Sequence, residues 1–451
     1  MTRAIPRPAG HPLLGMVPAF RHDLLGTLER TFREHGDCVA YRLGPARPRW
    51  LGRDVIAAYH PDDVARAMND GTVFGRDTTG FTVIRESIGD GLLTRDGDTW
   101  RRHRRTVQPL FSRRRVTGYA ALMAAEAEKI VDGPAMRPGI LDLHHLMQRF
   151  TLRVVGRALF GDDIDNVVAE LHELVPLLGE ASTARRLQLF TIPLTVPTPC
   201  NRPLRDVRRR LFAVAERVLN GWSRESSPVA DDLLSRLRGA RDPQTGETLS
   251  EQEIRDEVLG FLLAGHETTA GALTFTLHEL GRRPDLQDQI VAAVHEGGPA
   301  ADVLARAAVQ EGMRLYPPAH STERVTLENT EIAGCPVPVG SQILISPWVT
   351  HRHPEFWPDA HRFDPSRFVR EDRRPRYAYF PFGGGARACV GMQFALLEST
   401  VLLKALLSRF QVDTTQHDMT LAPLLTLRPA GPVLATVSRR ARAPRVADVL
   451  A

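Results

Sequence analysis

Apolar residues recur at helical spacing along most of the chain, and shorter runs of β-branched residues lie between these stretches. Two such runs, Arg324–Ile332 and Gln342–Ile345, predict strands, because Gly and Pro residues mark turns around them. We therefore expect a mainly α-helical fold (α+β) with a small β-sheet. The helical stretches are 60–70, 99–130, 140–160, 205–222, 250–282, 301–316 and 392–410.

The predicted helix over 250–282 is long and apolar on most faces. Ser250 is a good N-cap and Glu253 completes a capping box, whereas Gly281 and Pro284 end the helix. At 1.5 Å per residue the helix would be roughly 48 Å long, which is enough to cross the protein. We expect a central buried helix around which the other helices pack.

A polar patch, Gly265-His266-Glu267-Thr268-Thr269, interrupts this apolar helix. A buried carboxylate is costly unless it is bonded or near water. Thr hydroxyls can bond the carbonyl four residues back, and Gly265 allows a close approach to the backbone. The patch indicates a helix pressed against a flat ligand, with a groove for a diatomic molecule or water, although a solvated kink is the alternative.

The bulk composition is that of a globular protein. Of 451 residues, 43% are hydrophobic and 25% are charged, which excludes disordered and collagen-like classes. A chain of this length can fold around one large core. We expect a single domain over 1–451, with an extended arm over 1–22 and a loose tail over 438–451.

Charge and cysteine content limit the partners. The net charge of +5 is small for this length, and without zinc-finger spacing or a long basic tail we expect no nucleic-acid partner. The four cysteines form no CxxC pair, which suggests a reducing compartment. No signal-peptide core and no run of about 18 apolar residues is present, so we expect a soluble, cytoplasmic protein without a membrane partner.

A second motif combines a Gly-rich loop, Cys389 and an apolar helix that follows. Helix N-terminal amides and the helix dipole favour a thiolate there. A phosphate-binding loop would need Lys and Ser or Thr after the glycines, and a cysteine nucleophile would need a paired His. A thiolate ligand of haem iron needs no second cysteine. A small buried hydrophobe is the ordinary alternative.

Together these motifs resemble the cytochrome P450 family of haem-thiolate monooxygenases. The family's proximal loop, Phe-x-x-Gly-x-Arg-x-Cys-x-Gly, is intact in this chain. Its positions are Phe382, Gly385, Arg387, Cys389 and Gly391.

Four further motifs of that family occur in the family's order, and the resemblance covers nearly the whole chain. The oxygen-activating helix reads Ala264-Gly265-His266-Glu267-Thr268-Thr269, in place of Ala/Gly-Gly-x-Asp/Glu-Thr-Thr/Ser. The Glu-x-x-Arg pair, its arginine partner and the upstream Trp-x-x-x-Arg motif are also present. These are Glu311 with Arg314, Arg367, and Trp100 with Arg104.

The resemblance implies a P450 fold, a helical bundle around a long central helix with a small β-sheet subdomain, and haem b as cofactor. Cys389 would be the axial thiolate and the metal ligand, with Phe382 shielding the sulfur. Thr268 would lie beside the distal oxygen, with Glu267 as an acid connected to bulk water. Ala264 and Gly265 would leave room above the iron.

The haem propionates need cationic or hydrogen-bonding partners. The resemblance gives Arg387, Arg104 and Trp100 this role, with Arg324 as a fourth candidate, since Arg holds carboxylates bidentately and indole donates one N–H. The Glu-x-x-Arg pair and its arginine partner are expected to be structural.

The expected function is insertion of one oxygen atom from O2 into a hydrophobic small molecule, by hydroxylation or successive oxidation. Terpenoids, fatty acids and polyketides of secondary metabolism are the candidate substrates, and a terpenoid is favoured. The alternatives are oxidative coupling or ring closure, and a non-catalytic haem carrier or sensor. The expected pocket residues are Phe81, Val83, Ile84, Ile88, Leu92, Leu93, Leu187, Leu189, Phe190, Ile192, Phe261, Leu262 and Leu425.

The expected partners are a separate ferredoxin and ferredoxin reductase, which would supply electrons to a monomeric enzyme. Basic clusters at Arg101–Arg105 and Arg113–Arg115 suggest a docking face for an acidic protein, with steering that weakens in salt. A solvated, Arg-rich helix face is the alternative.

Overall fold

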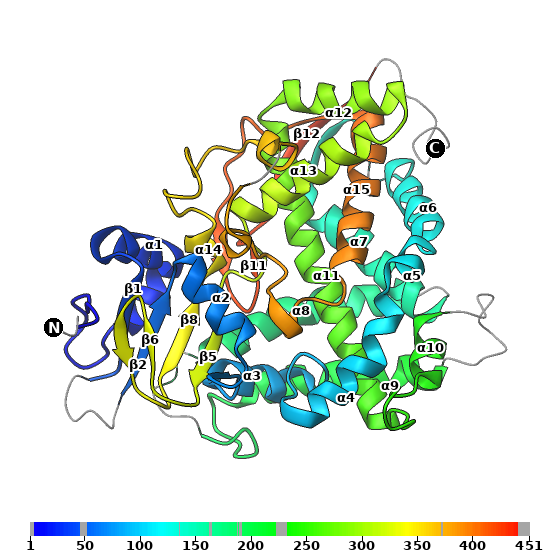
Figure 1. Ribbon diagram of the computed structural model, residues 1–451. Helices are drawn as coiled ribbons and strands as arrows, with labels where there is room; N and C mark the ends of the chain where they lie inside the picture. Colours follow the sequence, from blue (N-terminus) through cyan, green and yellow to red (C-terminus); the bar gives the residue numbers. More distant parts are fainter. Residues whose placement is uncertain are drawn as a thin grey trace.

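The computed structural model describes residues 4–45, 52–134, 136–161, 165–186, 188, 192–221, 232–370 and 373–440. In Figure 1 a sheet and the N-terminal helix lie on one side, helices fill the other side, and α11 runs through the helical part. The mainly helical α+β fold predicted from the sequence is confirmed.

More of the described residues lie in helices than in strands. The helices are α1 Val17–His35, α2 Pro61–Asn69, α3 Thr79–Ile88, α4 Gly97–Val107, α5 Arg113–Thr117, α6 Ala120–Val131, α7 Leu143–Phe160, α8 Asp165–Arg186, α9 Arg202–Gly221, α10 Leu233–Gly239, α11 Glu251–Gly281, α12 Pro284–Glu296, α13 Ala300–Leu315, α14 Pro347–Thr350 and α15 Met392–Arg409. The strands are β1 Cys38–Leu43, β2 Arg53–Ala58, β3 Phe74–Gly75, β4 Gly139–Asp142, β5 Thr322–Thr326, β6 Thr330–Ile332, β7 Cys335–Val337, β8 Gln342–Ile345, β9 Phe410–Asp413, β10 Leu421–Pro423, β11 Leu427–Pro429 and β12 Leu434–Arg439.

The largest sheet has the strand order β1-β2-β8-β5-β3. Its β2 and β8 pair in parallel, with Val55 opposite Gln342, and its other pairs are antiparallel. The single strand expected over 324–332 is divided at a bend, so β5 belongs to this sheet and β6 pairs with β7 in a separate hairpin.

Helix α11 begins as the sequence predicts. The Ser250 side chain accepts from the Glu253 amide, and the Glu253 carboxylate accepts from the Ser250 amide, so the capping box is complete. Leu259, Leu273 and Leu280 are fully buried, and α11 packs most extensively against α7 and α13. The helix therefore lies in the core, with its polar patch above the loop that precedes α15.

Some predicted boundaries are wrong. Pro at the start of a helix is favourable, so α1 begins at Val17 and takes the last part of the expected arm over 1–22. The stretch 99–130 is broken by a short 3-10 turn that contains Pro109. Strand β12 continues to Arg439, inside the expected tail, and 441–451 lie outside the described residues. No helix in the described part of the chain is long and apolar enough to cross a membrane.

Candidate active site

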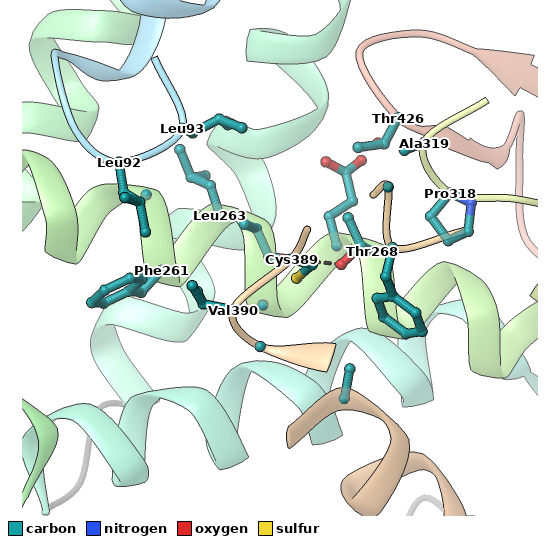
Figure 2. A pocket seen from close by; sticks show the side chains of 18 of the residues that line it. Leu92, Leu93, Phe261, Leu263, Thr268, Pro318, Ala319, Cys389, Val390 and Thr426 are labelled. Carbon is teal, nitrogen blue, oxygen red and sulfur yellow. Dashed lines mark hydrogen bonds between the residues drawn. The ribbon is translucent and has the colours of Figure 1, made fainter. Parts of the chain in front are cut away.

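A cavity of about 470 Å³ lies between α11, the loop before α15 and the loops that face them. This volume falls within the range of roughly 300–1,000 Å³ for small-molecule sites. Figure 2 shows the Cys389 sulfur and the Thr268 hydroxyl in this one cavity. The cavity is lined by every site residue predicted from the sequence: Trp100, Arg104, Ala264, Gly265, Glu267, Thr268, Arg324, Phe382, Arg387 and Cys389.

Cys389 faces the cavity from the end of the Gly-rich loop. Its amide donates to the Phe382 carbonyl at 2.9 Å, which folds the loop back on itself. Burial among protein atoms raises the pKa of the thiol, whereas the amides of Gly391 and Met392 and the charge of Arg104 lower it. The side chain is solvent-exposed through the cavity that it lines. This setting provides donors for a thiolate and an open position beside the sulfur.

Arg387 joins this loop to the opposite wall. Its guanidinium lies over the Trp100 ring, 3.9 Å from the centroid. Nη1 donates to the Arg95 carbonyl at 2.7 Å, and Nη2 pairs with Asp96. Burial lowers the pKa of Arg387 to about 10, Asp96 opposes that shift, and Arg324 and Arg104 add to it. Arg387 is therefore one member of a cluster of neighbouring cations.

Arg324 and Arg76 complete the cation cluster. Arg324 is buried, and it donates to the carbonyls of Ala67 and Glu323 and to the sulfur of Met68. Burial lowers its pKa to about 10. Burial also lowers the pKa of Arg76 well below its ordinary value, with Arg324 and Arg387 adding to the effect. The sequence motifs did not identify Arg76.

Arg104 takes a different position. Its Nη1 donates to the carbonyl of Ala388, next to Cys389, at 2.9 Å, and its Nε donates to Gln108. This arginine therefore supports the backbone of the cysteine loop from the cavity wall. Its charge is also one of the influences that lower the pKa of Cys389.

The cluster fits a group that brings two carboxylates and its own metal. Arg76 Nε is buried without a hydrogen-bond partner among the described residues, and a buried cationic group of this kind needs an anion. In the described part of the chain, no three His, Cys, Asp or Glu residues gather to hold a bare metal ion. A lone thiolate opposite several arginines suits haem, whose iron already carries four nitrogen ligands.

The polar patch of α11 faces Cys389 across the cavity. The Thr268 hydroxyl donates to the Ala264 carbonyl at 2.5 Å, four residues back, as the sequence predicts. Ala264 is exposed to the cavity. A Cβ on Gly265 would lie 2.9 Å from a methyl group of Val155. Close packing against α7 therefore accounts for the small size of Gly265 as much as space in the cavity does.

Glu267 is buried beside the β10–β11 hairpin. One carboxylate oxygen lies 3.8 Å from Arg428 Nη1, and the Thr426 side chain also contacts it. Burial raises the pKa of Glu267, and Arg428 opposes that shift. We expected this acid to reach bulk water, but only 9% of its surface is exposed. The carboxyl group is instead enclosed between α11 and β11.

Some of the expected pocket residues line the cavity and others do not. Val83 and Leu262 are buried in the core and do not line the cavity, and Ile192 lies at the surface with 42% exposure. Leu187, Leu189 and Phe190 lie outside the described residues. Residues that line the cavity as expected are Phe81, Ile84, Ile88, Leu92, Leu93, Phe261 and Leu425. Leu178 and Leu263 also line it and were missed, because helix periodicity alone does not tell a cavity-facing position from a core position.

The Glu311–Arg314 pair lies away from the chemistry. The two side chains form a bidentate pair at 2.7 and 2.8 Å, and Arg314 also donates to the carbonyls of His351, Ala360 and Arg362. Arg367 approaches Glu311 at 3.5 Å. These contacts tie α13 to the segment that precedes the cysteine loop.

Comparison with known proteins shows the family to which the chain belongs. Residues 5–435 match the family model described as Cytochrome P450. The chain is 36% identical over 418 residues to the cyclooctatin synthase of Streptomyces melanosporofaciens, which covers 90% of this chain and 89% of that protein.

Two further relatives are oxygenases by name. The cyclooctat-9-en-7-ol 5-monooxygenase of the same organism is 32% identical over 418 residues, covering 90% of this chain and 88% of that protein. The pentalenene oxygenase of Streptomyces avermitilis is 31% identical over 404 residues, covering 86% of this chain and 87% of that protein. The chain therefore belongs to the cytochrome P450 family, as a monooxygenase whose cofactor is haem with a thiolate ligand.

Proposed function

We propose that this monooxygenase hydroxylates a neutral, polycyclic terpenoid and that Cys389 is the thiolate ligand of its haem. Thiolate-bound haem activates molecular oxygen, so that one atom can enter a C–H bond. Cys389 suits the role because its sulfur faces the cavity and nearby amides donate to it. Such donors tune the electron density of a thiolate.

The ligand assignment has a direct test. Cys389→Ser should abolish the Soret position typical of thiolate-bound iron in the reduced, CO-bound protein. Cys335→Ser is a matched control, because Cys335 is buried in the β6–β7 hairpin and does not line the cavity. A thiolate spectrum that persists in the first variant would refute the assignment.

The cation cluster of Arg76, Arg324 and Arg387 would hold the two propionates of the haem. Arg76, Arg324 and Arg387 line the same cavity, and besides burial the charges of Arg324 and Arg387 lower the pKa of Arg76, while the charge of Arg324 lowers that of Arg387. Guanidinium groups bind carboxylates through paired N–H donors, and the Trp100 indole can add one more. Arg104 would act mainly on the cysteine loop, through the Ala388 carbonyl.

Glu267 and Thr268 would deliver protons. Burial raises the pKa of Glu267, so its carboxyl group is able to hold a proton that it can pass on. The Thr268 hydroxyl donates to the Ala264 carbonyl, and to pass a proton on it would turn this O–H toward the cavity while its oxygen accepts a proton that comes from Glu267. A relay from the Glu267 carboxyl through the Thr268 hydroxyl would serve the activation of oxygen.

The distribution of charged side chains in the cavity favours a neutral terpenoid over a fatty acid as substrate. Among the described lining residues, the basic side chains are the neighbouring Arg76, Arg104, Arg324 and Arg387, whereas the acids are Asp256, Glu257, Glu267 and Glu398, and the first two of these lie beside the apolar wall. A fatty acid would bring its carboxylate to a wall that offers acids and leucines, and an uncompensated charge there is costly. Relatives named for cyclooctat-9-en-7-ol and pentalenene add support for a terpenoid.

The substrate test compares two probes of opposite character. Cyclooctat-9-en-7-ol should displace the iron-bound water of the holoprotein, seen as a Soret shift, and a saturated fatty acid of similar carbon count should bind at least tenfold more weakly. With labelled molecular oxygen, the product should gain one labelled atom. Tighter binding of the fatty acid would refute the terpenoid assignment, and a coupled or cyclised product without label would favour the alternative chemistry.

The electron donor would be a separate acidic ferredoxin with its reductase, acting in the cytoplasm. Arg113–Arg115 are exposed on α5, which packs against α15 behind Cys389. In the other expected cluster Arg102, Arg104 and Arg105 are engaged in contacts within the chain. Reversing the charge of Arg113 and Arg114 should therefore slow reduction and weaken its salt dependence. Unchanged rates would remove α5 from the docking face.

A further inference from the structure

The segment 89–96 forms one wall of the cavity although it contains no helix or strand. Figure 2 shows Leu92 and Leu93 extending from this segment toward Phe261 and Leu263 of α11. An irregular segment keeps a fixed shape only where its backbone groups have partners. The groups that hold it therefore set part of the shape of the cavity.

The first turns of α11 supply two of these partners, as acceptors for backbone amides of the segment. Asp256 accepts from the amide of Asp90 at 3.0 Å, and Glu257 Oε1 accepts from the amide of Leu92 at 2.8 Å. Both acceptors are almost fully buried, with 4% and 2% exposure. A Cβ on Gly89 would lie 2.7 Å from the carboxyl carbon of Asp256. The segment thus lies directly against the helix, with buried carboxylates as its anchors.

His103 of α4 links two of the α11 carboxylates. Its ring is fully buried, Nδ1 lies 2.7 Å from Glu257 Oε1, and Nε2 lies 2.9 Å from Glu253 Oε1 and 3.4 Å from Arg102 Nη2. Burial opposes the ionisation of Glu253, but the Ser250 amide, His103 and Arg102 outweigh it and lower its pKa to about 2.

Glu257 depends on this imidazole. Its hydrogen-bond donors among the described residues are the Leu92 amide and His103 Nδ1, and both reach the same oxygen. A buried carboxylate that loses one of its donors reorients toward another, since leaving a buried polar group unsatisfied costs more than a typical hydrogen bond. Reorientation removes the acceptor that fixes Leu92.

We propose that His103 is a positioning residue for the substrate: it holds Glu257 as the acceptor of the Leu92 amide and so sets how far Leu92 and Leu93 project into the cavity. This inference deepens the proposed function by naming what shapes the substrate site. It concerns the cavity wall of the haem-loaded protein, and its test needs no terpenoid. The role of His103 can therefore be refuted without refuting the terpenoid substrate, and the reverse also holds.

The experiment measures hydrogen–deuterium exchange of the haem-loaded protein and its binding of two azoles. In His103→Gln, the amides of 89–95 should exchange about tenfold faster, whereas amides of α7 and α15 should keep their rates. Clotrimazole, a bulky azole, should bind several-fold more weakly by its Soret shift, and imidazole, which leaves the cavity mostly empty, should bind as before.

Two further variants keep the proposal falsifiable. Glu257→Leu removes the acceptor of the Leu92 amide and should reproduce both effects. Arg101→Gln is the control, because Arg101 lies on the same helix but pairs with the exposed Asp98, and its 89–95 amides should exchange as in the parent. Unchanged exchange and clotrimazole affinity in both His103→Gln and Glu257→Leu would overturn the proposal. Faster exchange throughout α7 and α11 would also overturn it, by making His103 a general structural residue.

Discussion

The guanidinium of Arg387 stacks on the indole ring of Trp100, with its central carbon 3.9 Å from the ring centroid. The two residues come from opposite walls, since Arg387 follows the glycines of the cysteine loop and Trp100 lies on α4. The stacked pair joins these walls at the arginine cluster. Its geometry uses the planar face of the guanidinium, which a lysine lacks.

Replacing Arg387 therefore tests the haem-binding end of the cavity. Arg387→Lys keeps the charge but loses the stacking and the paired donors, and it should weaken haem retention by about 1–2 kcal/mol. Trp100→Phe keeps a ring beneath the guanidinium and should have the smaller effect. The measurement is the ratio of haem to protein absorbance after competition with apomyoglobin. Full haem retention in Arg387→Lys would show that charge alone suffices.

The sequence located those site residues that lie in compact motifs, and missed those whose partners are distant. Arg76 belongs to no motif. It reaches the cluster because β3 pairs with β5, with Gly75 opposite Val325, next to Arg324. His103 lies inside the Trp100–Arg104 motif, but its acceptors follow about 150 positions later, on another helix. Neither contact has a local signature.

Helix boundaries were missed for equally specific reasons. Helix α8 contains Pro176 in its interior, and an internal proline ordinarily indicates that a helix ends. The Pro-rich start of the chain suggested an extended arm, yet proline in the first turn also favours helix initiation, as in α1. By contrast, the capping box of α11 is a local signal, and it was predicted correctly.

Thr268→Ala should uncouple the consumption of reductant from the formation of product. Loss of the hydroxyl interrupts the proposed relay from Glu267, and positioned proton transfer contributes at least about a hundredfold in rate. Product formed per NADPH oxidised should fall about tenfold, with peroxide making up the difference. Thr268→Ser keeps a hydroxyl and should remain largely coupled. Equal coupling in both variants would exclude Thr268 from the relay.

Arg314→Leu should destabilise the fold and not the chemistry. Removing one member of a buried pair costs about 3–5 kcal/mol, and Glu311 would keep only the longer contact with Arg367, at 3.5 Å, among its contacts with cations in the described part of the chain. Arg33→Ala is the control, because its pair with Glu29 joins an exposed arginine to its i−4 neighbour and should contribute at most about 1 kcal/mol. Urea unfolding of the haem-loaded protein measures both. Similar losses in the two variants would contradict a buried structural role for Arg314.

Acid should destabilise the protein through its buried histidines, of which His144 is the clearest case. Burial lowers the pKa of His144 to about 4, Asp142 opposes that shift, and Arg428 adds to it. In the unfolded chain the pKa would be about 6.5. Between these two values the unfolded state binds a proton that the folded state does not, so the free energy of unfolding falls as pH falls.

His144→Gln isolates this contribution. The amide can still contact the Thr274 hydroxyl, which lies 3.2 Å from His144 Nδ1, but it does not titrate. Between pH 6.5 and 4 the parent should lose about 3 kcal/mol more unfolding free energy than the variant, and above pH 7 the two should respond equally to pH. Urea unfolding of the haem-loaded proteins at stepped pH gives both curves. Parallel curves across the whole range would mean that His144 is protonated in the folded state or exposed to solvent, and would contradict its burial against α11.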